Sequence, residues 1–166
     1  MQNLLFHVDS RCIHGQIVAG WGFREQVKRF LLANDAVAAD EWERKQYLET
    51  PGSDFETHVL SIAESARRLK EWNDGKKTML IVGSPHDALR ILDSGVVPDL
   101  ISIGNLEPGL DKRQLAPSVF VGAGERQDLL EVIKRGIKVV ILPLPTSKPV
   151  PIAELLRENG TTDADR

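Results

Sequence analysis

Hydrophobic and polar positions follow two alternating patterns along the chain. Short runs of consecutive apolar residues, such as residues 78–82, are typical of strands that are buried on both faces. Between them lie longer segments in which apolar residues recur every three or four positions, the spacing of an amphipathic helix. The predicted strands are residues 4–8, 30–33, 57–60, 78–82, 100–103, 119–121 and 138–142. The predicted helices are residues 14–28, 35–48, 61–72, 84–95, 126–134 and 152–157.

Strands and helices in alternation predict an α/β fold: a doubly wound, mostly parallel sheet of about seven strands with helices on both faces. Local signals support the helix boundaries. Ser61 with Glu64 three residues later forms a capping box, and Ser84 followed by Pro85 is typical of a helix start. Gly136 is a helix stop.

The length of the chain fits one domain. It has 166 residues, and a domain of this size buries a substantial core. We expect a single domain over residues 1–158. The last residues, 159–166, are polar, and we expect them to be a disordered tail.

Composition narrows the function classes. Hydrophobic residues make up 42% and charged residues 27%, with a net charge of -3, which argues against a nucleic-acid binder held by a positive field. Cys12 is the single cysteine, so neither an internal disulfide nor a cysteine-built metal site is expected. The apolar stretch at the start is too short for a signal peptide, and no apolar run reaches membrane-spanning length. We therefore expect a cytoplasmic protein.

The loop after the first strand carries the clearest candidate chemistry. Parallel sheets place ligand sites at the carboxyl ends of their strands, where loops lead into helices. Here the loop holds Asp9 and Arg11, then His14, Gly15 and Gln16 at the start of a predicted helix. Free N–H groups at a helix start favour an anion, and the planar fork of an arginine matches phosphate oxygens. The pattern favours a nucleophilic histidine that carries a phosphoryl group.

A second loop, residues 83–85 after the fourth strand, offers Ser84 as a further phosphate-binding group. If the winding of the sheet reverses between the first and fourth strands, the two loops face each other.

Each candidate also has a structural interpretation when the residues are taken alone. A histidine in the place of His14 is more often a helix cap or a surface histidine, and a serine in the place of Ser84 is more often only a helix cap. Cys12 fits a small apolar filler, and His7 either a core histidine or a functional one. His58 and His86 lack metal-ligand spacing and are interpreted as structural. The three tryptophans, Trp21, Trp42 and Trp72, are expected to pack on the sheet, with Trp21 also near His14.

Residues 7–17 read His-Val-Asp-Ser-Arg-Cys-Ile-His-Gly-Gln-Ile. They resemble the active-site loop of IIB components of the mannose/sorbose family of the bacterial phosphoenolpyruvate-dependent sugar phosphotransferase system. The usual form of that loop is Arg-(Ile/Val)-Asp-Asp-Arg-Leu-Ile-His-Gly-Gln-Val, followed by a tryptophan, as Trp21 follows here. Residues 34–41, 100–104 and 138–145 are similar to family segments as well. The departures are His7, Ser10 and Cys12, which stand where the family has arginine, aspartate and leucine.

The resemblance implies a seven-stranded fold and a specific activity, that of a protein-phosphohistidine–sugar phosphotransferase. A phosphorylated IIA protein donates the phosphoryl group to His14, expected at Nδ1, while Asp9 and Arg11 shape the loop. The group then passes to a sugar as it enters through the membrane subunits IIC and IID, so the chain is expected at the inner membrane peripherally, through its partners. No metal or organic cofactor is implied.

An alternative stays open: a regulatory phosphoprotein that accepts phosphate on His14 but signals by binding another protein. In both cases the donor is a protein. We therefore expect His14 to lie on an open surface with an apolar rim such as Ile13 and Trp21.

Overall fold

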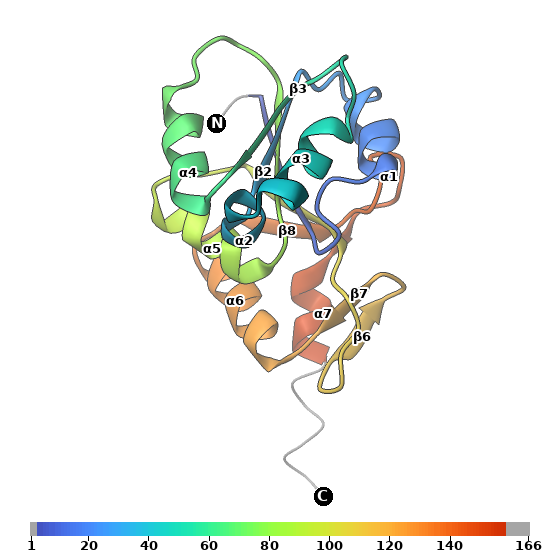
Figure 1. Ribbon diagram of the computed structural model, residues 1–166. Coiled ribbons are helices and arrows are strands. Elements are labelled where there is room, and N and C mark those ends of the chain that lie inside the picture. The colour runs from blue at the N-terminus through green and yellow to red at the C-terminus, as the bar shows by residue number, and fades with distance from the viewer. Residues whose placement is uncertain (1–2, 159–166) are drawn as a thin grey trace, which may run out of the picture.

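A seven-stranded sheet forms the centre of the computed structural model, which describes residues 3–158 (Figure 1). The strand order is β3-β2-β4-β1-β5-β8-β9; the first six strands run parallel, and β9 is antiparallel to β8. The predicted α/β class is therefore confirmed, and the tail predicted at 159–166 lies outside the described residues. The strands of the sheet are β1 (Leu4–Asp9), β2 (Arg29–Ala33), β3 (Glu56–Leu60), β4 (Thr78–Val82), β5 (Leu100–Asn105), β8 (Lys138–Ile141) and β9 (Val150–Pro151).

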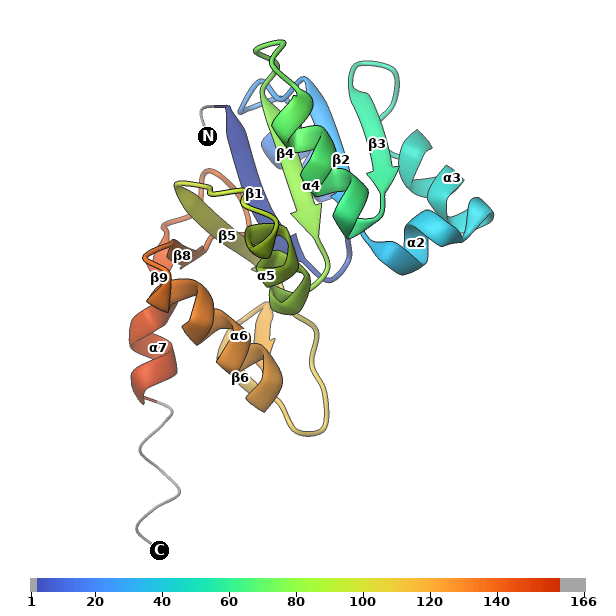
Figure 2. The same cartoon turned by 90° about the vertical axis from the view of Figure 1, so that its left-hand side faces the viewer.

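Two layers of helices cover the sheet. One face packs against α1 (Gly15–Ile17), the π-helical turn η1 (Val18–Gly22), α2 (Asp35–Ala39) and α3 (Glu41–Glu49). The other face packs against α4 (Ile62–Glu71), α5 (Pro85–Asp93), α6 (Ala123–Lys134) and α7 (Ile152–Glu158). Figure 2 looks towards the face on which α4 and α5 lie.

The winding of the sheet reverses between β1 and β4. These two strands are adjacent, yet β1 continues into the layer of α1 and β4 into the layer of α5. A crevice at the carboxyl ends of the strands is the usual ligand site at such a reversal. The loops that follow β1 and β4 are the two that the sequence pointed to.

Two predicted helices on the same face of the sheet are wrong in extent. The helix expected over residues 14–28 ends at Gly22, where Val27 N–H closes onto Gly22 O at 2.9 Å and Gln26 adopts a left-handed φ of 54°. The helix expected over 35–48 is two helices, because Asp40 is extended between them. Its side chain accepts a hydrogen bond from Glu43 N–H at 2.8 Å and so caps α3.

A small hairpin lies beyond the carboxyl end of β5. The predicted strand at 119–121 is β7 (Val119–Val121), and it pairs antiparallel with β6 (Arg113–Ala116), which the sequence did not predict. Ser118 Oγ donates to Gly104 O at 2.8 Å, so the hairpin is joined to the end of β5. The helix expected from residue 126 begins earlier, at Ala123, because Glu125 accepts from Gly122 N–H.

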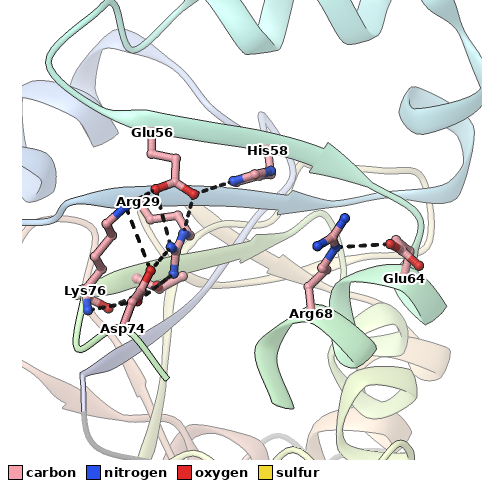
Figure 3. Close-up of polar contacts among 8 residues, drawn as sticks. Arg29, Glu56, His58, Glu64, Arg68, Asp74 and Lys76 are labelled. Atoms are coloured by element: carbon pink, nitrogen blue, oxygen red, sulfur yellow. Dashed lines mark hydrogen bonds and ion pairs between the residues drawn. The ribbon is translucent and has the colours of Figure 1, made fainter. Parts of the chain in front are cut away.

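The amino ends of the strands hold an ion-pair network (Figure 3). Arg29 is buried at the start of β2 and donates to Glu56 and Asp74, while its guanidinium lies 3.9 Å from the centre of the Trp72 ring. His58 joins the network through Glu56 at 2.7 Å. This network lies at the end of the sheet opposite to the loops after β1 and β4. His58 and Trp72 thus have structural surroundings, as expected, whereas Trp42 is 72% exposed on α3 and does not pack on the sheet.

Candidate functional site

The loop between β1 and α1 is shaped by its backbone. The pairing of β1 with β5 shifts register between Val8 and Asp9, and Ser10 N–H then bonds to Asn105 O at 3.0 Å. Cys12 adopts a left-handed φ of 60°, and its N–H returns to Asp9 O at 2.9 Å. This tight turn brings His14 back over the end of the strand that carries Asp9.

Asp9 is the hub of the loop. Its Oδ1 accepts from Arg11 N–H at 2.9 Å and from Arg11 Nε at 3.1 Å. Its Oδ2 accepts from Arg11 Nη2 at 3.0 Å and from His14 Nε2 at 3.1 Å. The carboxyl group is buried, and both of its oxygens are occupied by donors from the next five residues. The structure thus brings Asp9, Arg11 and His14 together, the three residues that the sequence singled out.

The hydrogen bond to Asp9 determines which nitrogen of a neutral His14 ring carries the proton. Burial alone would raise the pKa of the Asp9 carboxyl, but the hydrogen bonds from His14 and Arg11 outweigh it and lower that pKa. An ionised carboxylate only accepts hydrogen bonds, so the neutral His14 ring carries its proton at Nε2. Its Nδ1 therefore has a free lone pair. The His14 side chain is 21% exposed, so the loop presents it at the surface.

The other residues of the loop lie at different depths. The exposed Gly15 has no atom near the position of a Cβ, and Gln16 Oε1 lies 3.5 Å from Arg11 Nη1. His14 itself occupies the N-cap position of α1, in an extended conformation. The expected apolar rim is wrong: Ile13 and Trp21 are buried, and Trp21 donates to Pro143 O at 3.0 Å. Apolar side chains of this size have a lower free energy when they are packed between the loop and the sheet than when they are exposed to water.

The second loop lies beside the first. A Cβ placed on Gly83 would contact Cys12 Sγ at 3.9 Å, so the loop after β4 abuts the turn of the β1 loop. Ser84 caps α5 by accepting from Asp87 N–H at 3.1 Å, as predicted. Among the contacts of the described residues, none joins Ser84 to His14. Cys12 is buried, and burial raises the pKa of its thiol to about 11, which fits an apolar filler.

His7 is the residue whose place the sequence left open. It lies fully buried beneath the loop, with Nδ1 2.7 Å from Ser102 Oγ and Nε2 4.0 Å from Asp9 Oδ2. A Cβ on Gly104 would come within 2.5 Å of His7 Nε2, so only glycine leaves room for this ring. The available sequence signal was the spacing of His7 and Asp9, two residues apart and therefore on the same face of β1.

Two further findings bear on the chemistry. In the range 3–158 there is no group of three or more His, Cys, Asp or Glu side chains that could hold a metal ion. Over the same range no helix is both long and apolar enough to cross a membrane.

Known proteins are similar to this chain over nearly its whole length. Residues 3–166 match the family described as the sorbose subfamily IIB component of the PTS system. The fructose-specific EIIB component of Bacillus subtilis is 24% identical over 158 residues, covering 95% of this chain and 97% of that protein. The sorbose-specific EIIB component of Klebsiella pneumoniae is 26% identical over 162 residues, covering 96% and 98%.

Solved structures of such components have the same fold as this chain. The IIBSor domain of the sorbose permease from Klebsiella pneumoniae superposes with a TM-score of 0.87 at 25% identity, covering 95% of this chain and 98% of that one. The N-acetylgalactosamine-specific IIB component 1 from Escherichia coli gives a TM-score of 0.83 at 24% identity, covering 90% and 99%. With the family match spanning both the sheet and the His14 loop, the chain belongs to the sorbose subfamily of IIB components of the phosphotransferase system.

Proposed function

We propose that the chain is a phosphocarrier that accepts a phosphoryl group on His14 from a IIA protein and transfers it to a sugar. The observation that carries this proposal is the hydrogen bond between His14 Nε2 and the buried Asp9 carboxylate. It leaves Nδ1 as the nitrogen with a lone pair and holds the ring in place on a partly exposed loop. A fixed, singly protonated imidazole is the form of histidine that acts as a nucleophile.

The transfer step follows from that geometry. The Nδ1 lone pair attacks the phosphorus atom, the new N–P bond forms, and the bond from phosphorus to the donor histidine breaks. The electron pair of the broken bond stays with the donor nitrogen. His14 Nε2 keeps its proton and its bond to Asp9 throughout, so Asp9 opposes the positive charge that develops on the ring. In the second step the hydroxyl oxygen of the sugar attacks the same phosphorus, and the N–P bond to His14 breaks. The electron pair of that bond returns to Nδ1, and the hydroxyl proton passes to solvent.

The remaining loop residues supply the anion site. Arg11 uses its Nε–Nη2 edge on Asp9 and directs Nη1 to Gln16 Oε1 at 3.5 Å, which leaves the second hydrogen of each Nη for phosphoryl oxygens. The N–H groups of Gly15 and Gln16 belong to the first turn, whose donors have no partner within the helix. The Ser84 hydroxyl, which uses only its oxygen to cap α5, still has a hydrogen to donate.

The partners we propose are a phosphorylated IIA protein as donor and the membrane subunits IIC and IID as the route of the sugar. In this scheme the chain works at the cytoplasmic face of the inner membrane. The name of one relative, the mannose-specific EIIAB component of Escherichia coli, includes both IIA and IIB, and this chain spans 47% of the length of that relative.

The test begins with phosphoenolpyruvate, the general phosphotransferase proteins and a cognate IIA protein. We expect one phosphoryl group per chain, on His14, with the acid-labile and base-stable behaviour of a P–N bond, measured by intact mass and ³¹P NMR. His14→Ala should abolish the label, and His86→Asn, which changes an exposed histidine, is the matched control. Label that persists in His14→Ala, or that maps to His7 or His58, contradicts the assignment.

A second stage separates transport from regulation. The labelled protein is added to membranes that contain IIC and IID, with a panel of hexoses, hexosamines and ketoses outside. Transfer of label to one sugar supports the phosphocarrier. Stable phosphorylation with no transfer to any sugar, together with phosphorylation-dependent binding of another protein, supports the regulatory phosphoprotein instead.

A further inference from the structure

One buried nitrogen beside the site has no hydrogen-bond partner. His7 Nε2 is fully buried and unpaired, although it lies 4.0 Å from Asp9 Oδ2. Nearly all buried polar groups in proteins are paired, so an unpaired one next to a reactive loop needs a physical reason. Because Asp9 Oδ2 already accepts from His14 and Arg11, the position of this nitrogen connects it directly to the chemistry.

The tautomer of His7 follows from its other nitrogen. Ser102 Oγ donates its single hydrogen to Phe6 O at 3.2 Å, so towards His7 it acts as the acceptor. His7 Nδ1 therefore carries the ring proton and donates to Ser102 Oγ at 2.7 Å. The unpaired Nε2 is left with a lone pair that faces the Asp9 carboxylate. Two groups that can accept hydrogen bonds but cannot donate them therefore face each other. A proton on His7 Nε2 would turn this contact with Asp9 into an ion pair.

Phosphorylation changes the charge around this contact. A phosphoryl group on His14 adds a dianion to a loop that already contains the Asp9 carboxylate, and Arg11 is the cation nearest to both. If the Arg11 guanidinium turns towards the phosphoryl oxygens, its hydrogen bonds to Asp9 weaken. Negative charge nearby favours the protonated form of an imidazole.

We propose that His7 is a positioning residue that takes up one proton at Nε2 when His14 is phosphorylated and then pairs with Asp9 Oδ2. The proton comes from solvent, the neutral ring becomes an imidazolium, and no electrons are transferred. The inference rests on the proposed function, because it needs phosphorylated His14. Its effect is to keep Asp9, and through it the His14 ring, in the same orientation in both states of the carrier.

The surroundings of His7 contain few other groups that respond to pH. From β1 and its loop, Asp9, Arg11 and His14 face it; from β5, Ser102 and Gly104; from η1, the Trp21 ring at 5.2 Å between centroids. The β4 residue paired with it is Ile81. Burial lowers the pKa of His7 to about 4, against the opposing effect of Asp9, so the unphosphorylated protein keeps this ring neutral near neutral pH.

The first measurement uses the unaltered protein with ¹⁵N-labelled histidine. A neutral ring gives two well-separated ¹⁵N resonances, and an imidazolium gives two similar ones. At pH 6 we expect His7 to be neutral without phosphate and to become protonated when His14 is phosphorylated, with a rise in pKa of about 2 units or more. A His7 ring that stays neutral at pH 5 in the phosphorylated protein overturns the proposal.

The second measurement is the phosphoryl equilibrium with the IIA donor between pH 7.5 and 5, for the unaltered protein, His7→Asn and the control His86→Asn. Asparagine keeps a donor towards Ser102 but cannot take up the proton. The ratio of the equilibrium constants of unaltered protein and His7→Asn cancels the donor's own pH dependence, and it should rise about tenfold as the pH falls. A flat ratio overturns the inference, whereas absence of phosphate on His14 overturns the proposed function instead.

Discussion

At the residue scale, Asp9 sets the arrangement of the site, because both of its oxygens accept hydrogen bonds from Arg11 and His14, the side chains that we propose bind and carry the phosphoryl group. Arg11 makes three hydrogen bonds to this one carboxylate, through its backbone N–H, Nε and Nη2. Its side chain is nevertheless 39% exposed, so it belongs both to the buried hub and to the open surface. A substitution at this position therefore changes the proposed anion site and the support of Asp9 together.

Arg11→Lys should slow phosphorylation of His14, and Arg11→Ala should slow it further. Lysine keeps the charge but loses the planar fork, while alanine also removes the hydrogen bonds to a charged group, worth about 1.5–3 kcal/mol. The measurement is the single-turnover rate of phosphoryl transfer from phospho-IIA, with circular dichroism to show that the fold is intact. An unchanged rate in Arg11→Ala would place this side chain outside the phosphate site.

At the scale of elements, the Ser84 hydroxyl at the start of α5 has two roles that can be tested separately. Ser84 caps this helix, and we also propose that it donates to the phosphoryl group. Ser84→Ala should lower the free energy of unfolding by about 1 kcal/mol, whereas Ser84→Gly should lower it by only a few tenths, because glycine is a tolerated N-cap.

The two variants should nevertheless slow phosphoryl transfer equally, since both lack the hydroxyl group. Chemical denaturation and single-turnover rates check the two effects separately. If neither variant slows transfer while Ser84→Ala is destabilised, Ser84 is a helix cap and nothing more.

Periodicity predicted the central strands well and the helix ends less well. The strands β2 and β4 are buried on both faces, so from Phe30 and from Met79 their sequences read as unbroken apolar runs, and in β1 only His7 interrupts the run that ends at Val8. The break at Asp40 had a local signal, since Glu43 follows three residues later, but helical spacing on both sides concealed it. In the π-helical turn η1, Val18 and Trp21 pack against residues of the sheet, and no local sequence pattern reports that packing.

At the scale of the whole molecule, two titrating clusters at opposite ends of the sheet should govern acid stability in separate ranges. His7 has an ordinary pKa of 6.5 and a folded pKa of about 4, so the unfolded chain binds the proton first. Stability is full above pH 6.5 and falls as the pH drops towards 4, by on the order of 3 kcal/mol. Hydrogen bonds from Arg29 chiefly lower the pKa of Glu56 from 4.5 to about 2, so its contribution is lost between those values.

Thermal unfolding of the unphosphorylated protein at pH 7.5, 5 and 3 checks this assignment. His7→Asn should flatten the decrease in stability between pH 6.5 and 4, and Glu56→Gln the decrease below 4.5. His86→Asn, on an exposed side chain, serves as the control for the upper range. Identical pH profiles for His7→Asn and the unaltered protein would mean that His7 does not titrate as its burial requires.

The site was predictable from the sequence where the motif is local. Asp9, Arg11 and His14 lie within six consecutive residues, and one tight turn is enough to join them. What lies beneath them comes from distant parts of the chain: Ser102 and Gly104 meet His7 only because β5 pairs with β1. A single sequence carries no signal for that register, so the partner of Nδ1 and the unpaired Nε2 emerged only from the fold.

The burial of Cys12 has a practical consequence for site-specific labelling. It is the chain's only cysteine, and its thiol is both inaccessible and weakly acidic, so it reacts slowly with maleimides near neutral pH. A cysteine introduced at the fully exposed Leu110, in the loop that leads to the β6–β7 hairpin, would then be the one reactive thiol among the described residues. A fluorophore attached there would lie on the exposed loop between β5 and β6, and a change in its emission would report that a partner protein contacts this loop.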